Sequence, residues 1–303
     1  MPDTQANAMY VYDRRQGRLV REIVLGDTWL RLAYHAPCRP MLRWLLFRRR
    51  WASRLLGWYC DAPISRRRIA GTITALHLDP AEFRDPVSSF RSFNDFFTRH
   101  LRPGARPFDP ASGSLSSPAD ARLLVYPRLE QDTCVPLKGA AFTVAALLKP
   151  VTASPDFRHG SLVVLRLCPA DYHRYHYPAG GRSLRSWEID GHLDSVHPVA
   201  LALGLRVFVE NWRRVELLDL EGFGQAAFVE IGAFGVGATV QTHAQPEFDK
   251  MDEKGYFKFG ASTIVLVFET GRVEFDTDLV ERSANGCETL VRAGETIGRA
   301  PPA

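Results

Sequence analysis

Past residue 118 the sequence runs as short apolar stretches, each only a few residues long and each bounded by turn-forming residues. Runs of this length are typical of strands, because helices in globular proteins usually need ten or more residues. Turn-forming residues and the short spacing between some of the runs favour antiparallel pairing over strand–helix–strand units. The runs are Leu162–Leu167, Ala226–Ile231, Ala238–Thr242, Thr263–Phe268 and Arg272–Phe275.

A segment rich in proline, glycine and serine separates this β-rich part from the residues before it. Residues 102–118 contain four prolines and two glycines, a composition typical of a linker or a surface loop. The upstream residues carry helical patterns instead. We therefore predict an α+β chain, in which a helical, basic N-terminal region of residues 1–101 packs on a mostly antiparallel β sandwich or barrel of residues 102–303.

Helical periodicity and positive charge mark the N-terminal region. Residues 1–70 hold 14 arginines and no lysine against five acidic residues, a net charge of +9, whereas the whole chain carries only +4. Apolar residues recur at helical spacing within residues 41–58 and again within residues 87–101, where Ser92 or Asn94 is a possible N-cap. A basic head on a mildly acidic body favours an anionic partner, either lipid head groups or nucleic acid.

The first of these stripes matches a helix that lies in the plane of a membrane interface. Its tryptophan rings would sit at head-group depth, and the flanking arginines would contact anionic lipid. The candidate contacts are Trp44, Trp51 and Trp58 with Arg43, Arg50 and Arg54. A helix that packs the same stripe on the domain behind it is the open alternative. No run reaches the ~18 apolar residues of a spanning helix, and the N-terminus lacks a signal pattern, so the chain is expected to be soluble or to lie on a membrane.

The sequence lacks the patterns of the common cofactor sites. Its five cysteines are scattered and never spaced C-x-x-C, which argues against a disulfide framework or a thiolate zinc site and favours a reducing compartment. His173 and His176 could bind a metal, but no third ligand stands at zinc-site spacing. Neither a metal nor a nucleotide is therefore expected.

Three short features could carry chemistry. His173 and His176 follow a β-like run, and imidazole titrates near neutrality, so both are candidates for acid–base work. Ser262 stands in a small-residue turn that leads into an apolar run, which is a plausible place for a nucleophile. Asp120 follows a proline-bearing turn and could orient a histidine. Taken singly, each feature is more often structural.

Together, these features and the motifs around them resemble the phosphatidylserine decarboxylase family over nearly the whole chain. The motifs are Phe93–Arg99 (FNDFFTR), Arg102–Pro107 (RPGARP), Ser117–Asp120 (SPAD), Leu137–Gly139 (LKG), Leu167–His176 (LCPADYHRYH), Gly232-Ala233 with Val236-Gly237, and Lys254–Thr263 (KGYFKFGAST). Ordered motifs spread along the chain are far more specific than any one of them.

The resemblance implies that the chain is made as an inactive proenzyme that cuts itself. Ser262 is then the internal nucleophile, His176 its general base and Asp120 the group that orients the histidine, as in a serine-protease triad. The hydroxyl of Ser262 attacks the carbonyl of Ala261, and elimination from the resulting ester leaves a pyruvoyl group at the new N-terminus.

The implied cut separates a β chain, residues 1–261, from an α chain, residues 262–303. The pyruvoyl ketone is the expected cofactor: it forms a Schiff base with the substrate amine and draws in the electrons released with CO2. His173 is the implied proton donor or orienting group at the α-carbon. The expected reaction converts phosphatidylserine to phosphatidylethanolamine and CO2.

The resemblance also implies partners and a location. Phosphatidylserine and an anionic membrane surface are the expected partners, and the α and β chains of one precursor are expected to assemble as a homodimer. Nucleic acid is not expected. The chain is predicted to be a peripheral protein on the cytoplasmic side of the cell membrane.

The sequence departs from the usual family pattern at several positions. Ala261 stands where glycine is usual, and its methyl group could slow cleavage because glycine reaches backbone conformations that alanine avoids. Ala121 replaces the glycine after Asp120, while Val196-His197-Pro198 and Asn211-Trp212-Arg213 replace Val-Asn-Pro and Asn-Glu-Arg. Two alternatives stay open: a pyruvoyl decarboxylase of a soluble amino acid such as tryptophan, and a non-catalytic lipid-surface relative.

Overall fold

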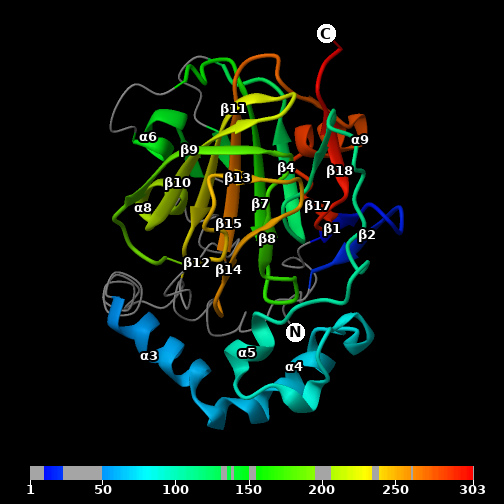
Figure 1. Ribbon diagram of the computed structural model, residues 1–303, viewed down its shortest axis with the longest axis vertical. Coiled ribbons are helices and arrows are strands. Elements are labelled where there is room, and N and C mark those ends of the chain that lie inside the picture. Colours follow the sequence, from blue (N-terminus) through cyan, green and yellow to red (C-terminus); the bar gives the residue numbers. More distant parts are fainter. Residues whose placement is uncertain are drawn as a thin grey trace, which may run out of the picture.

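A large, mostly antiparallel sheet forms the centre of the molecule (Figure 1). The computed structural model describes residues 10–22, 50–130, 135–137, 140–149, 155–194, 206–233, 239–260 and 262–302. Within these residues the central sheet has ten strands, in the order β13-β9-β10-β11-β15-β7-β4-β17-β1-β2. In that order the strands are Glu247–Phe248, Gly181–Ile189, Arg213–Leu220, Gly224–Ile231, Ser262–Phe268, Ser161–Leu167, Ala121–Tyr126, Thr289–Val291, Tyr10–Asp13 and Arg18–Arg21. The pairing is antiparallel except between β1 and β17.

The central strands are apolar on both faces because both faces are covered. In β15, Ile264 and Leu266 belong to one core, whereas Val265 and Val267 belong to the other. Successive side chains of a strand point to opposite faces, so a continuous apolar run fills two cores at once. The predicted strands Leu162–Leu167 and Thr263–Phe268 are therefore confirmed, as β7 and β15.

Each face of the sheet has its own cover. Among the described residues, one face packs against two three-stranded sheets and the helix α9 (Thr277–Ala284). The first small sheet consists of β12 (Thr239–Gln241), β14 (Glu253–Phe257) and β8 (Arg174–His176). The second consists of β16 (Glu274–Phe275), β18 (Thr296–Arg299) and β3 (Ser114–Ser116). The other face packs against α6 (Val144–Leu148), α8 (Val207–Glu210) and the hairpin of β5 (Val135–Leu137) and β6 (Ala140–Phe142). The fold is a mixed α+β fold, and within the described residues its sheets do not close into a barrel, the alternative to a sandwich that the sequence left open.

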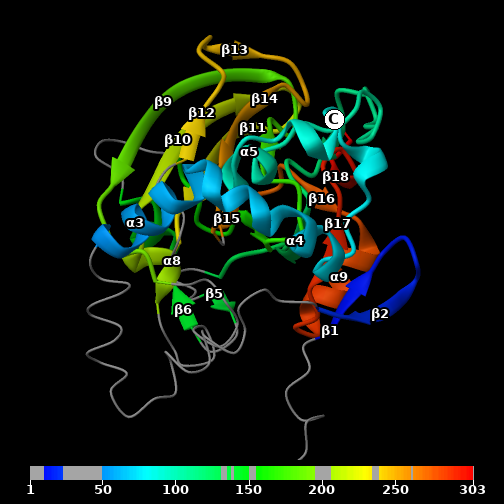
Figure 2. The same cartoon turned by 90° about the horizontal axis from the view of Figure 1, so that it is seen from below.

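A helical layer lies across one end of the sheet (Figure 2). Its elements are α3 (Arg50–Asp61), η1 (Pro63–Arg68), α4 (Ile69–Ala75), η2 (Pro80–Glu82), η3 (Val87–Ser89) and α5 (Phe93–Phe97). A core of phenylalanines holds the layer together, with Phe83, Phe90 and Phe96 in edge-to-face contact. None of the helices in the described part of the chain is long and apolar enough to cross a membrane.

The helix expected over residues 87–101 is much shorter than its apolar spacing suggests. Ser92 is extended and caps α5, with its Oγ accepting a hydrogen bond from the N–H of Asp95 at 3.1 Å. An N-cap in the β region breaks the helix before it. The apolar residues spaced as in one long helix instead form a phenylalanine cluster, which is built from a 3-10 turn (η3) and one short helix (α5).

The first described residues form a hairpin, which departs from the helical region predicted for residues 1–101. Gly17 turns the chain with a φ of 65°, and Arg14 between the strands binds Asp276 and Asp278, each at 2.7 Å. Glu22 follows the hairpin and is buried between two arginines of the central sheet. This part of the basic head therefore belongs to the sheet. The division of the chain near residue 102 stays a prediction.

Candidate active site

The strand register brings the candidate residues to one end of the sheet. Ser262, the first residue of β15, pairs with Leu167 at the end of β7. Asp120 directly precedes β4, the strand on the other side of β7, whose Ala121 lies at this same end. The two histidines follow β7 after one turn of the chain. Residues that are far apart in sequence thus flank the end of one strand, next to the helical layer.

Ser262 has a buried hydroxyl that finds no hydrogen-bond partner in the described part of the chain. Its side chain is 0% exposed, and its Oγ has no hydrogen-bond partner among the described residues. A buried hydroxyl without a partner is costly, and a catalytic role is one explanation for such an atom. Its neighbour across the expected cut, Ala261, lies outside the described residues.

His176 lies in β8 against the turn that carries Asp120. Its backbone N–H donates to the carbonyl oxygen of Pro118 at 2.8 Å, and its Nδ1 lies 3.4 Å from the same oxygen. Burial lowers the pKa of His176, while the carboxylates of Glu253 and Asp120 oppose that shift. A histidine kept neutral in this way can accept a proton near pH 7.

Asp120 does not hydrogen-bond to His176 in this structure. Its Oδ1 accepts from Nε of Arg106 at 2.8 Å and from the N–H of Ala293 at 2.9 Å, and its Oδ2 accepts from Nη2 of Arg106 at 2.6 Å. The expected contact between the acid and the histidine is therefore absent among these described residues, although the charge of Asp120 still acts on both His173 and His176.

His173 is fully buried, and a backbone carbonyl fixes its tautomer. Its Nδ1 lies 2.9 Å from the carbonyl oxygen of Asp171, which can only accept, so Nδ1 carries the hydrogen and Nε2 the lone pair. That Nε2 is buried without a partner among the described residues. Burial lowers the pKa of His173 to about 3. The ring packs on Phe97 of α5, with 4.0 Å between the centroids.

The motif at residues 93–99 proves to be a wall of this site. Phe93 and Phe97 contact Phe259 edge to face, at 5.0 and 5.1 Å between centroids. Asn94, considered as an N-cap, instead accepts from the N–H of Phe259 at 2.8 Å and donates to Asp61 at 2.9 Å. The helical layer thereby fixes the residues just before the expected cut.

Sequence reasoning missed Arg99, a buried guanidinium beside the site. It is 5% exposed, lies over the rings of Phe83 and Phe96, and has no carboxylate partner in the described part of the chain. Burial lowers the pKa of Arg99 to about 10, and the charge of Asp120 opposes this. A buried charge without a counter-ion is costly, and an arriving anion would relieve that cost. Its place at the end of the motif was the available signal.

The membrane-contact candidates are only partly described. Trp44 and Arg43 lie outside the described residues, and Arg50 begins α3. Trp51 and Trp58 of α3 are 48% and 71% exposed, Leu55 beside them is 58% exposed, and Arg54 is exposed. In the described ranges, no cluster of potential metal ligands occurs.

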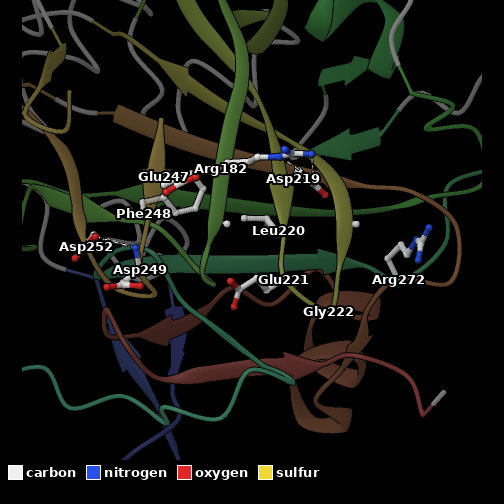
Figure 3. Close-up of a pocket in the computed structure, with 12 residues that line it drawn as sticks. Arg182, Asp219, Leu220, Glu221, Gly222, Glu247, Phe248, Asp249, Asp252 and Arg272 are labelled. Atoms are coloured by element: carbon white, nitrogen blue, oxygen red, sulfur yellow. Dashed lines mark hydrogen bonds and ion pairs between the residues drawn. The ribbon is translucent and has the colours of Figure 1, made fainter. Parts of the chain in front are cut away.

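A cavity of about 830 Å³ lies elsewhere, beside the β10–β11 hairpin (Figure 3). Leu220 and Gly224 line it, and both stand at the end of the sheet opposite Ser262. Charged side chains of both signs surround it, including Arg182, Asp219 and Arg272. It shares no residue with the candidate site, which is defined instead by the strand ends and the buried histidines.

Comparison with known proteins agrees with the motifs. Residues 93–299 match the family model described as phosphatidylserine decarboxylase. A phosphatidylserine decarboxylase proenzyme of Clostridium beijerinckii is 36% identical over 95% of this chain and 98% of its own length. Proenzymes of the same name from Desulfitobacterium hafniense strain Y51 and Chlamydia felis are 38% and 36% identical, again over 95% of this chain and over 97% and 96% of their own lengths. This chain therefore belongs to the phosphatidylserine decarboxylase family.

Proposed function

We propose that this chain cuts itself between Ala261 and Ser262 and then decarboxylates phosphatidylserine to phosphatidylethanolamine and CO2. The observation that carries the proposal is the buried hydroxyl of Ser262, which has no partner among the residues that the structure describes and lies at the strand end that His173 and His176 flank. The proenzymes that the chain resembles over nearly their whole length support the substrate.

In the self-cleavage that we propose, His176 takes the proton of the Ser262 hydroxyl. The Oγ then bonds to the carbonyl carbon of Ala261, the peptide C–N bond breaks, and the new amino group takes the proton. A base then takes the Cα proton of Ser262 while its Cβ–O bond breaks and the carboxylate of Ala261 leaves. The dehydroalanine tautomerises to an imine, and water replaces the imine nitrogen, which releases ammonia and leaves a pyruvoyl group. Asp120 stabilises the positive charge that His176 carries between these steps.

The orphaned polar atoms of the site fit a pyruvoyl group and its substrate. When formed, that group supplies a ketone that binds the substrate amine covalently and accepts the electrons released with CO2. His173 offers Nε2 as a lone pair in its resting state. It must therefore gain a proton within the site before it can return one to the α-carbon of the product.

Arg99 is the side chain best suited to the anionic part of the substrate. We infer that it binds the phosphodiester rather than the serine carboxylate, since an arginine on the carboxylate would stabilise the ground state and oppose the loss of CO2. Its aromatic cradle keeps the guanidinium in place when no anion is present.

The helical layer is the proposed contact with the membrane. Trp51, Leu55 and Trp58 expose large apolar area on α3, and aromatic and basic residues together favour an anionic bilayer surface. A peripheral position on the cytoplasmic side, and a homodimer of cut protomers, remain proposals that rest on the family resemblance.

The deciding experiment is the intact mass of the purified protein under denaturing conditions. We expect an α chain that begins at position 262 and is lighter by one ammonia than a serine-initiated peptide, and release of CO2 from phosphatidylserine vesicles. Ser262→Ala should stay a single chain, and a cut Ser262→Ala protein would refute the mechanism.

The same experiment separates the two alternatives. A single uncut wild-type mass that Ala261→Gly converts to two chains would mean that the methyl group of Ala261 stalls the proenzyme. No cut in either protein would favour a non-catalytic relative. Release of CO2 from free tryptophan but not from phosphatidylserine would favour the soluble-substrate enzyme.

A further inference from the structure

Arg106 forms a bidentate ion pair with the carboxylate of Asp120. Nε donates to Oδ1 at 2.8 Å and Nη2 donates to Oδ2 at 2.6 Å, and both side chains are only 11% exposed. The N–H of Ala293 adds a third hydrogen bond. A two-pronged arginine–carboxylate pair fixes orientation as well as charge. Asp120 is thus held before any histidine contacts it.

The same arginine connects separate parts of the chain. Its Nη1 donates to Oε2 of Glu82 at 3.0 Å, and Oε1 of Glu82 pairs with Nη1 of Arg292, also at 3.0 Å. Glu82 belongs to the helical layer, Arg106 to the segment after it, and Arg292 and Ala293 to the C-terminal piece. Asp120 is therefore fixed from both sides of the proposed cut.

Several other charged or titratable groups act on Asp120. They are Arg99 after α5, Asp171, Tyr172 and His173 before β8, His176 in β8, and Arg292 and Glu295 after β17. Burial by itself would raise the pKa of Asp120; the hydrogen bonds and charge of Arg106, with the Ala293 amide, outweigh burial and hold it below its ordinary value. The neighbouring carboxylates of Asp171 and Glu295 would oppose ionisation if Arg106 were absent.

We propose that Arg106 is a positioning residue for self-cleavage, which keeps the Asp120 carboxylate ionised and in one orientation beside the two histidines. The inference rests on the proposed self-cleavage. Without Arg106, burial and the carboxylates of Asp171 and Glu295 would raise the pKa of Asp120 and favour its protonated form. A protonated Asp120 no longer stabilises a charged His176, so cleavage would slow.

The test follows self-cleavage of freshly translated chain on denaturing gels across pH 5–9. Since one pKa unit is a factor of ten in protonation, Arg106→Gln should cut the rate by about tenfold or more near pH 6 and by much less near pH 9. Arg106→Lys, which keeps a charge, should restore most of the rate near neutral pH. Glu82→Gln, which loosens Arg106 without touching Asp120, should keep the wild-type pH profile.

A second measurement does not depend on cleavage. In the Ser262→Ala background, urea unfolding reports how Asp120 titrates. With Arg106 present, the pKa of Asp120 is lower in the folded protein than in the unfolded chain, where it is about 4. The ionised carboxylate therefore stabilises the fold above about pH 4, and this stability is lost as the pH falls further. With Arg106→Gln the sign reverses, so this variant should gain stability relative to its parent between pH 7 and pH 4.

The outcomes separate the two claims. The positioning role would be overturned if the free energy of unfolding changed with pH in the same way with and without Arg106. It would also be overturned if Arg106→Gln slowed self-cleavage by the same factor at every pH. A wild-type chain that stays uncut at every pH would overturn the proposed function, while the unfolding comparison would still decide whether Arg106 sets the charge of Asp120.

Discussion

Replacement of Lys254 by methionine should cost this fold more than any exposed charge change. Lys254 lies in β14 and is 0% exposed. Its Nζ contacts Oε2 of Glu216 at 2.5 Å, Oε1 of Glu230 at 2.6 Å and Oε1 of Gln241 at 2.9 Å. One buried cation thus joins a small sheet to two strands of the central sheet.

The magnitude follows from what the substitution leaves behind. Glu216 and Glu230 are 6% and 1% exposed, so Lys254→Met would leave two buried carboxylates without their cation. Removing one side of a buried ion pair costs about 3–5 kcal/mol of unfolding free energy. The matched control is Arg182→Gln, which breaks a pair with Asp219 whose side chains are 62% and 39% exposed; such pairs contribute about 1 kcal/mol or less.

Urea unfolding in the Ser262→Ala background, where the chain stays in one piece, is the assay. The triple variant Lys254→Met/Glu216→Gln/Glu230→Gln should recover most of the loss, because a neutral set leaves no charge unpaired. A Lys254→Met loss below about 1 kcal/mol, or a triple variant no more stable than the single one, would refute the reasoning.

Three further outcomes are expected. His173→Ala should still cut itself into two chains on a denaturing gel, while its rate of CO2 release falls at least about 100-fold, as for the loss of a general acid–base group. If this variant stayed uncut, the roles of the two histidines would be exchanged. Arg99→Gln should raise KM for phosphatidylserine about tenfold or more. Any inhibition by glycerophosphoethanolamine, which carries the phosphodiester, should weaken in this variant, whereas any inhibition by free serine should not change. An unchanged KM would remove Arg99 from the substrate site. Trp51→Ala/Trp58→Ala should weaken flotation with anionic vesicles while the cut proceeds; full flotation would assign these rings another role.

The strands could be predicted because their signal is local. Apolar runs bounded by turn residues gave β7, β11 and β15 within a residue or two, since a strand buried on both faces must be apolar throughout. The short helix α5 could not be placed in the same way. Its phenylalanines satisfy helical spacing, but the cluster around Phe96 uses that spacing through separate turns.

Long-range ion pairs are where sequence reasoning stopped. The charge of the N-terminal region looked like a surface property, yet Arg14 is bound to Asp276 and Asp278 at the other end of the chain. No local pattern requires that pairing, nor that of Asp120 with Arg106. The motifs named the residues of the candidate site, and only the fold showed which of them touch.

The position of β15 inside the central sheet determines how the two pieces of a cut chain would be held together. This strand is the first element after the proposed cut and lies between β11 and β7, hydrogen-bonded to both. Once the peptide bond before Ser262 is broken, the smaller piece is a subunit whose interface is the protein's own core. Such a subunit cannot exchange between molecules without unfolding both. If the chain cuts itself as proposed, mixing mass-labelled cut protein with unlabelled cut protein should therefore give no hybrid molecules while both stay folded.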